Sequence, residues 1–202
     1  MQKYSVLSLI KNAFSSHKDW EVAWKDQDPK KEYDVVIIGG GGHGLATAYY
    51  LAKEHKITNI AVIEKGWIGG GNIGRNTTII RSNYMHDENA LFYEKGMELW
   101  RSMSQDLNFN IMFSPRGIIN LAHSDAQMNA YARRGNSMKL NGIDAVLLNR
   151  EEVKNKVPIL DFSDNVRFPI FGGLMQPSAG TARHDAVAWG YARQADSMGV
   201  DI

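Results

Sequence analysis

A glycine-rich turn that joins an apolar strand to a helix constrains the fold of this chain most. Residues 33–38 run apolar after a polar start, which is typical of a parallel strand buried on both faces. Glycines then crowd 39–44 in the spacing G-x-G-x-x-G, and a helix is predicted over 45–55. A second apolar strand is predicted over 60–63, and it ends in Glu64, 20 residues after the last glycine of the turn. This order of strand, glycines, helix, strand and acid predicts a nucleotide-binding βαβ unit.

The glycines of the turn have separate roles in such a unit. Gly39 permits the tight turn, Gly41 lets the backbone approach a pyrophosphate, and Gly44 lets helix and strand pack closely. Glu64 stands where the ribose-binding acid belongs, which disfavours a cofactor with a 2′-phosphate such as NADP. His43 lies inside the turn, where a spacer beside the phosphates is favoured over proton transfer. The alternative is a glycine-rich turn in an unrelated α/β unit.

A second glycine-rich loop, residues 65–81, follows the acid directly. A plain NAD-binding unit continues into another crossover helix and strand, whereas this loop is rich in backbone donors and ends in polar side chains. Such a loop can follow a long, extended cofactor towards its ring system, which favours FAD over NAD. A flexible surface loop is the alternative.

Composition excludes several other classes of function. Lys plus Arg number 23 against 22 Asp plus Glu, so the formal charge of +1 gives no electrostatic footprint for nucleic acid or an anionic membrane. No apolar run approaches the roughly 18 residues of a membrane span. The absence of Cys excludes thiol catalysis, and the six His residues have no paired metal-ligand spacing, so no metal is expected. No signal peptide is recognisable, and a cytoplasmic location is expected.

The chain divides into four predicted segments. Trp20 and Trp24 of the first segment can dock on a neighbouring surface, most simply that of their own domain. Residues 199–202 resemble a helix cap and the first residues of a strand, so we expect a truncated chain. The segments are an N-terminal arm (1–31), the nucleotide-binding βαβ start with its second loop (32–85), part of an inserted antiparallel domain (86–176) and an incomplete return to the nucleotide-binding domain (177–202).

The periodicity of the later segments predicts mostly helices. Their aromatic and methionine side chains are expected in the core. Thr181 is expected to cap the last helix, so that His184 lies in its first turn and points inward with Val187 and Tyr191. The predicted elements are helices over 86–107, 125–140, 150–156 and 181–198, a hairpin over 111–122, a strand over 144–148 and extended segments near 168–175.

Three stretches together resemble a known family. They are GGGGHGLATAYYLA from Gly39, IEKGWIGGGNIGRNTTIIRSNY from Ile63, and QPSAGTARHDAVAWGYAR from Gln176. From about Tyr33 onward the chain resembles the β subunits of heterotetrameric sarcosine oxidases, within the FAD-dependent amine and amino-acid oxidases. The resemblance implies an α/β fold, an FAD-binding Rossmann-like domain with an inserted antiparallel substrate domain. The family's β subunit is considerably longer, so the chain looks truncated against it.

The resemblance also implies which residues hold a non-covalent FAD. Glu64 would bind the adenosine ribose. Arg81 falls where related amine oxidases place the arginine that grips the substrate carboxylate, a bidentate contact that suits a guanidinium. The alternative is a structural arginine paired with Asp87 or Glu88. The pyrophosphate residues would be Gly39, Gly41, Gly42, His43 and Gly44, and the residues near the flavin would be Asn72, Arg75, Asn76, Thr77, Thr78 and Ile79.

A second flavin is implied at the last helix. The family carries FMN covalently on a histidine of the β subunit, and the matching residue is His184. A helix N-terminus and Arg183 would favour its phosphate. Without the resemblance, a core histidine with satisfied hydrogen bonds is favoured.

The implied activity is the oxidative demethylation of sarcosine to glycine. Electrons would pass from FAD to FMN and then to O2, giving H2O2, while the one-carbon unit would pass to tetrahydrofolate on a partner subunit. The implied partners are an α subunit, which also carries NAD, and two small subunits. This fragment alone is expected to be inactive. The alternatives are a single-flavin amine or amino-acid dehydrogenase and a non-catalytic nucleotide-binding fragment.

Overall fold

The computed structural model describes residues 6–16, 18, 24 and 27–202, so Trp20 lies outside the described residues. A short helix, α1 (Val6–Phe14), comes first. Trp24 packs edge-to-face on Trp189, with ring centroids 5.6 Å apart, and its indole N–H donates to the carbonyl of Ile202 at 3.1 Å. The arm is thus fastened at Trp24 to the chain's own last helix, as expected.

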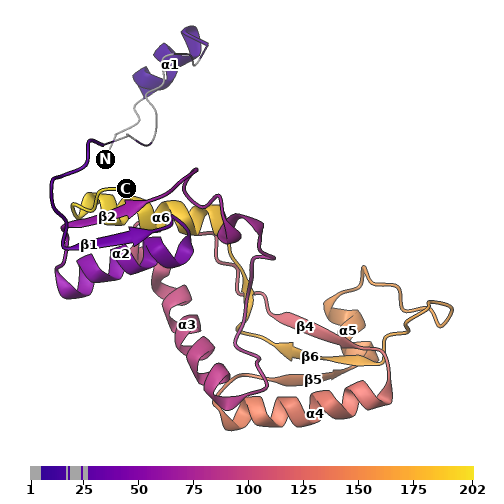
Figure 1. Ribbon diagram of the computed structural model, residues 1–202. Helices are drawn as coiled ribbons and strands as arrows, with labels where there is room; N and C mark the ends of the chain where they lie inside the picture. Colours follow the sequence, from indigo (N-terminus) through magenta and orange to yellow (C-terminus); the bar gives the residue numbers. More distant parts are fainter. Residues whose placement is uncertain (1–5, 17, 19–23, 25–26) are drawn as a thin grey trace.

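The first lobe is built on the predicted βαβ unit (Figure 1), and we call it the parallel lobe. Strands β1 (Val35–Ile38) and β2 (Ile60–Ile63) pair in parallel. Helix α2 (Gly42–His55) joins them and packs against α6 (His184–Ser197), the last helix of the chain. The core between them contains Leu45, Ala48, Ile60, Val187 and Tyr191.

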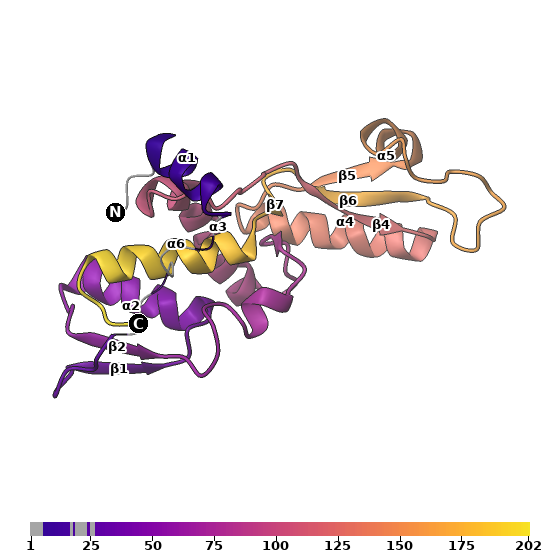
Figure 2. The ribbon, with the colours of Figure 1, turned by 90° about the horizontal axis from the view of Figure 1, so that it is seen from above.

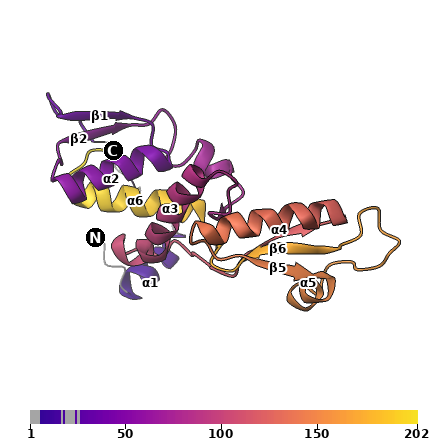
Figure 3. The ribbon, with the colours of Figure 1, turned by 90° about the horizontal axis from the view of Figure 1, so that it is seen from below.

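The outer face of this strand pair is exposed. Val36 is 54% and Ile38 88% exposed, because α2 and α6 both lie on the other face (Figure 3). The prediction that 33–38 is buried on both faces is therefore wrong for the described residues. The apolar run reflects a strand with two apolar faces, of which this part of the chain covers one.

The second lobe is an antiparallel sheet, which we call the antiparallel lobe. Its strand order is β4-β6-β5, with β6 (Gly172–Gln176) pairing on both sides. The outer strands are β4 (Ile118–Ala122) and β5 (Val146–Asn149). Helices α4 (Asp125–Leu140) and α5 (Arg150–Lys156) lie on opposite sides of the sheet (Figure 2) and confirm the helices predicted there.

The hairpin predicted over 111–122 is wrong. The segment before β4 crosses from one lobe to the other, so β4 finds its partner in β6 instead of folding back on residues 111–114. Ser114 forms an isolated antiparallel bridge with Thr181.

Extended segments and a helix join the lobes. Strand β3 (Ile79–Ile80) pairs antiparallel with β7 (Gly180–Thr181), while α3 (Asp87–Asp106) runs from the antiparallel lobe to the parallel lobe. Thr181 therefore does not cap α6. The residue before the helix is Arg183, which makes no side-chain capping bond, and His184 is the first helical residue.

Beyond Gly199 the predicted strand is present as a bridge. Asp201 pairs in parallel with Ala61 beside β2. None of the described helices is long and apolar enough to cross a membrane.

Candidate functional site

The first glycine loop brings the backbone of α2 to an open surface. Gly39 has φ +109°, a conformation that favours glycine, and a Cβ added to Gly44 would lie 2.0 Å from the carbonyl oxygen of Gly39. Gly41 precedes α2 without any side-chain cap, and a Cβ added there would meet nothing within 4 Å. The first N–H groups of α2 are therefore accessible to an anion from outside the chain.

Glu64 joins the two glycine loops. One carboxylate oxygen accepts the N–H of Gly40 at 2.8 Å and the other accepts the N–H of Gly66 at 2.9 Å. These backbone donors, Gly66 foremost, lower the pKa of the Glu64 carboxyl, so it is ionised at neutral pH. Each oxygen keeps a lone pair for a hydroxyl donor.

The end of the second loop is held by its own side chains. The Asn76 amide donates to the carbonyl of Ile73 at 2.8 Å, and its oxygen accepts the N–H of Thr78 at 2.7 Å. Thr78 has φ +61°, which is strained for a β-branched residue. Strain of this kind is concentrated at functional sites.

Both loops line one large cavity of about 820 Å³. Helix α3 and the start of α6 close its other sides. Four of the predicted residues, Glu64, Arg75, Arg81 and Arg183, are not part of the lining. The predicted residues that line it are Gly39, Gly41, Gly42, His43, Gly44, Asn72, Asn76, Thr77, Thr78, Ile79 and His184.

The α3 wall of the cavity was missed by sequence reasoning, which assigned its side chains to the core. Gly96 sits in the middle of this wall, inside the helix, where glycine costs about 1 kcal/mol relative to alanine. A Cβ there would meet nothing within 4 Å. A glycine in the interior of a helix, within an apolar stripe, was the sequence signal that could have indicated a cavity wall here. The wall residues are Phe92, Gly96, Leu99, Trp100 and Met103.

His184 enters the cavity from the first turn of α6. Its Nδ1 is buried and has no hydrogen-bond partner among the described residues, so it is not a core histidine with satisfied hydrogen bonds. Val187 and Tyr191 on the same helical face are buried, as expected. Arg183 forms an ion pair with Asp185 and lowers the pKa of that carboxyl to about 2. The positive charge of Arg183 is thus neutralised by the carboxylate of Asp185.

Arg81 is held in a different place, between the lobes. It donates to the side-chain oxygen of Asn83 at 2.6 Å and lies over the ring of Tyr84, 4.9 Å from its centroid. Within the described part of the chain it forms no ion pair with Asp87 or Glu88.

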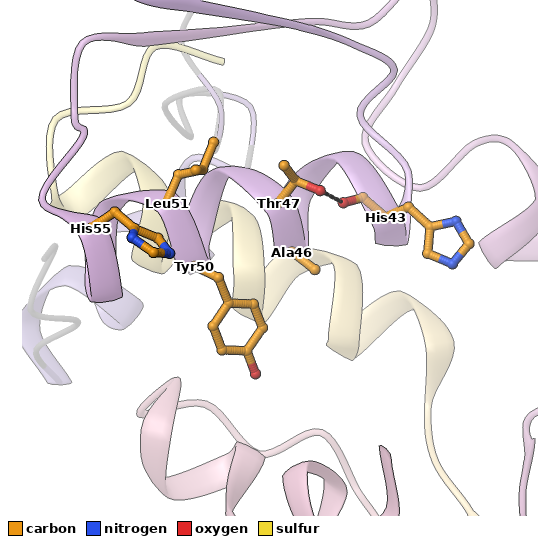
Figure 4. Close-up of a pocket in the computed structure, with 6 residues that line it drawn as sticks. All are labelled: His43, Ala46, Thr47, Tyr50, Leu51 and His55. Atoms are coloured by element: carbon orange, nitrogen blue, oxygen red, sulfur yellow. Dashed lines mark hydrogen bonds between the residues drawn. The ribbon is translucent and has the colours of Figure 1, made fainter. Parts of the chain in front are cut away.

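A smaller hollow of about 490 Å³ lies on the outer side of α2 (Figure 4). His43 and His55 stand at opposite ends of its lining, too far apart to share an ion, and Thr47 donates to the carbonyl of His43 at 2.8 Å. The described residues contain no group of three side chains that could hold a metal.

Comparison with known proteins identifies the class. The model of the family "FAD dependent oxidoreductase" matches residues 34–202. The chain belongs to this family of FAD-dependent oxidoreductases.

Its relatives within the family include sarcosine oxidase β subunits. The chain is 62% identical to the one from Rhizobium meliloti over 99% of its length, and 52% identical to the one from Rhodobacter capsulatus over 100%. It spans about half of these relatives, 48% and 49% of their lengths. The crystal structure of L-proline dehydrogenase from P. horikoshii, 28% identical, superposes with a TM-score of 0.76 over 86% of this chain and 44% of that one.

Proposed function

We propose that this chain is the FAD-binding part of a sarcosine oxidase β subunit. One observation carries the proposal: two glycine loops line a single cavity together with His184, whose buried Nδ1 has no hydrogen-bond partner among the described residues. The similarity to sarcosine oxidase β subunits supports the substrate.

The residues present fit an FAD. The uncapped start of α2 would hold the pyrophosphate, with Gly41 leaving room for close approach. Glu64 would accept the ribose hydroxyls while it keeps both loops in place. Asn72, Asn76, Thr77, Thr78 and Ile79 would line the path towards the ring system, and Arg75 would flank it.

The residues also fit a second flavin on His184. A buried ring nitrogen without a partner is costly, and a covalent bond to FMN would give the imidazole a role. The apolar wall of α3 would face a planar ring, and the start of α6 would attract the phosphate. Arg183 is proposed to contribute only if its pair with Asp185 opens.

When bound, the two flavins would supply the redox chemistry: FAD the oxidation of the N-methyl amine of sarcosine, and FMN the reduction of O2 to H2O2. Arg81 would orient the substrate through its carboxylate. The one-carbon unit would pass to tetrahydrofolate on a cytoplasmic assembly that includes an α subunit with NAD and two small subunits. The antiparallel lobe would provide part of the substrate domain.

A mass spectrum of the full-length protein, purified with its copurifying subunits from flavin-replete cells, tests this function. We expect the peptide that contains His184 to gain the mass of FMN, and FAD to be released on denaturation. The variant His184→Ala should lose the added mass and keep FAD, whereas His55→Ala on the outer side of α2 should lose neither. An unmodified His184 in a complex that holds FAD would establish the single-flavin alternative. Failure to retain any flavin would favour a non-catalytic subunit.

A further inference from the structure

Two arginines lie at the junction between the lobes, and neither has an acidic partner among the described residues. Arg81 follows β3, and Arg134 comes from α4 in the antiparallel lobe. Arg81 donates to the side-chain oxygen of Asn83, and Arg134 donates to the backbone oxygen of the same residue. Among the described acidic residues none forms an ion pair with either guanidinium.

Arg134 is the less satisfied of the two. Its Nε is buried and has no hydrogen-bond partner in the described part of the chain. Burial lowers the pKa of Arg134, and the nearby positive charge of Arg81 lowers it further. An unpaired, half-buried guanidinium beside a second cation is costly unless an anion joins them.

The surroundings hold both arginines in place. Asn83 is fully buried, and its amide donates to the Asn120 side chain of β4 at 2.9 Å. The Tyr84 ring beneath Arg81 stacks on Tyr93, with centroids 4.1 Å apart. The two guanidinium groups are therefore fixed relative to each other by a buried hub, which suits a bidentate ligand.

We propose that Arg134 is a second guanidinium of the substrate-carboxylate site, which it forms together with Arg81. The site takes a small carboxylate, the group that all amino-acid substrates share. This inference rests on the proposed function, because it assumes that Arg81 contacts substrate. It assigns to the antiparallel lobe one specific contact with the substrate.

The test uses acetate as the probe and uncharged acetamide as its control. Acetate is titrated into the full-length, flavin-loaded protein, and flavin absorbance reports binding. We expect saturable acetate binding that weakens about 10- to 100-fold in Arg134→Gln and in Arg81→Gln. The exposed neighbour on α4 supplies the matched variant, Arg133→Gln, which should bind acetate within about twofold of the wild type. Acetamide should not bind in any of them.

The variant Arg134→Lys distinguishes a substrate contact from a purely structural role. Lysine keeps a positive charge and a donor for Asn83 but cannot bind both oxygens of a carboxylate. The variant should therefore fold and still raise the KM for sarcosine more than it lowers kcat. Wild-type acetate affinity in a folded Arg134→Gln or Arg134→Lys protein would overturn the inference, as would a wild type that does not respond to acetate. Weaker binding in Arg81→Gln alone would leave the proposed role of Arg81 standing. If acetate binding is unchanged in both arginine variants, the proposed roles of Arg81 and Arg134 are both contradicted.

Discussion

The carboxylate of Glu64 lies 2.8 Å from the backbone N–H of Gly40, so the acid at the end of β2 holds the first glycine loop. Its other oxygen holds the second loop through Gly66. The residue proposed to bind the ribose thus also sets the spacing of the two loops around the cavity.

Glu64→Gln should weaken FAD binding. The amide keeps the shape of the side chain, but its nitrogen cannot accept an N–H, so one loop loses its anchor and the ribose loses a charged acceptor. We expect the Kd for FAD, measured by fluorescence quenching on the reconstituted full-length protein, to rise at least about tenfold. The exposed Glu32→Gln serves as the control, and equal Kd values in the two variants would contradict this role of Glu64.

Gly44→Ala and Gly96→Ala should have opposite effects on stability. The new Cβ at position 44 would meet the carbonyl oxygen of Gly39 at 2.0 Å, so we expect a loss of about 3 kcal/mol. The new Cβ at position 96 would meet nothing within 4 Å inside a helix, so we expect a gain of about 0.5–1 kcal/mol. Urea unfolding followed by circular dichroism measures both. A stable Gly44→Ala protein would show that the turn has another conformation.

Gln176→Leu should destabilise the junction between the lobes. Gln176 is fully buried, accepts the N–H of Ser82 at 3.1 Å and donates to the Ser82 hydroxyl at 2.7 Å. Leucine would leave the buried N–H without an acceptor, at a cost of about 2–3 kcal/mol in the free energy of unfolding. The exposed Gln105→Leu should change it by less than about 0.5 kcal/mol. Similar urea midpoints for Gln176→Leu and Gln105→Leu would show that the hydrogen bonds between Gln176 and Ser82 do not stabilise the junction.

Asp201→Asn should lower stability in a pH-dependent way. Lys30 lies 2.9 Å from the Asp201 carboxylate, and this contact, with help from Tyr33, lowers its pKa in the folded chain. A lowered folded-state pKa stabilises the fold above the ordinary value near 4, and the benefit disappears as pH falls through the folded value.

We expect a difference of about 0.5 kcal/mol between wild type and Asp201→Asn at pH 7. The difference should close in acid and shrink in high salt, as measured by urea unfolding across pH. The exposed Asp28→Asn serves as the control. A difference that persists in acid would point to packing instead of charge.

Local patterns in the sequence were sufficient for the βαβ unit and for the helices of the antiparallel lobe. The turn at Gly39 and Gly44 was predictable because steric contacts within a few residues require glycine there. The helix over 125–140 was predictable because Ser124 stands directly before it, where its side chain accepts the N–H of Gln127.

Features that depend on distant partners were not predictable. The segment 111–122 contains turn residues, yet its strand partners lie roughly sixty residues onward: β4 pairs with β6, and Ser114 bridges to Thr181 of β7. Thr181 has the side chain of a cap, but pairing with Ile79 takes it into a strand. The α3 wall resembled core because an apolar stripe has the same pattern whether it faces protein or a cofactor cavity.

Helix α6 has a consequence for the order of events during synthesis. It completes the hydrophobic core around α2 and also carries His184 to the cavity that begins at Gly39. A nascent chain that has left the ribosome only as far as the antiparallel sheet lacks both this packing surface and the imidazole. The flavin attachment proposed at His184 would therefore have to wait until α6 has been translated, however early the glycine turn has folded.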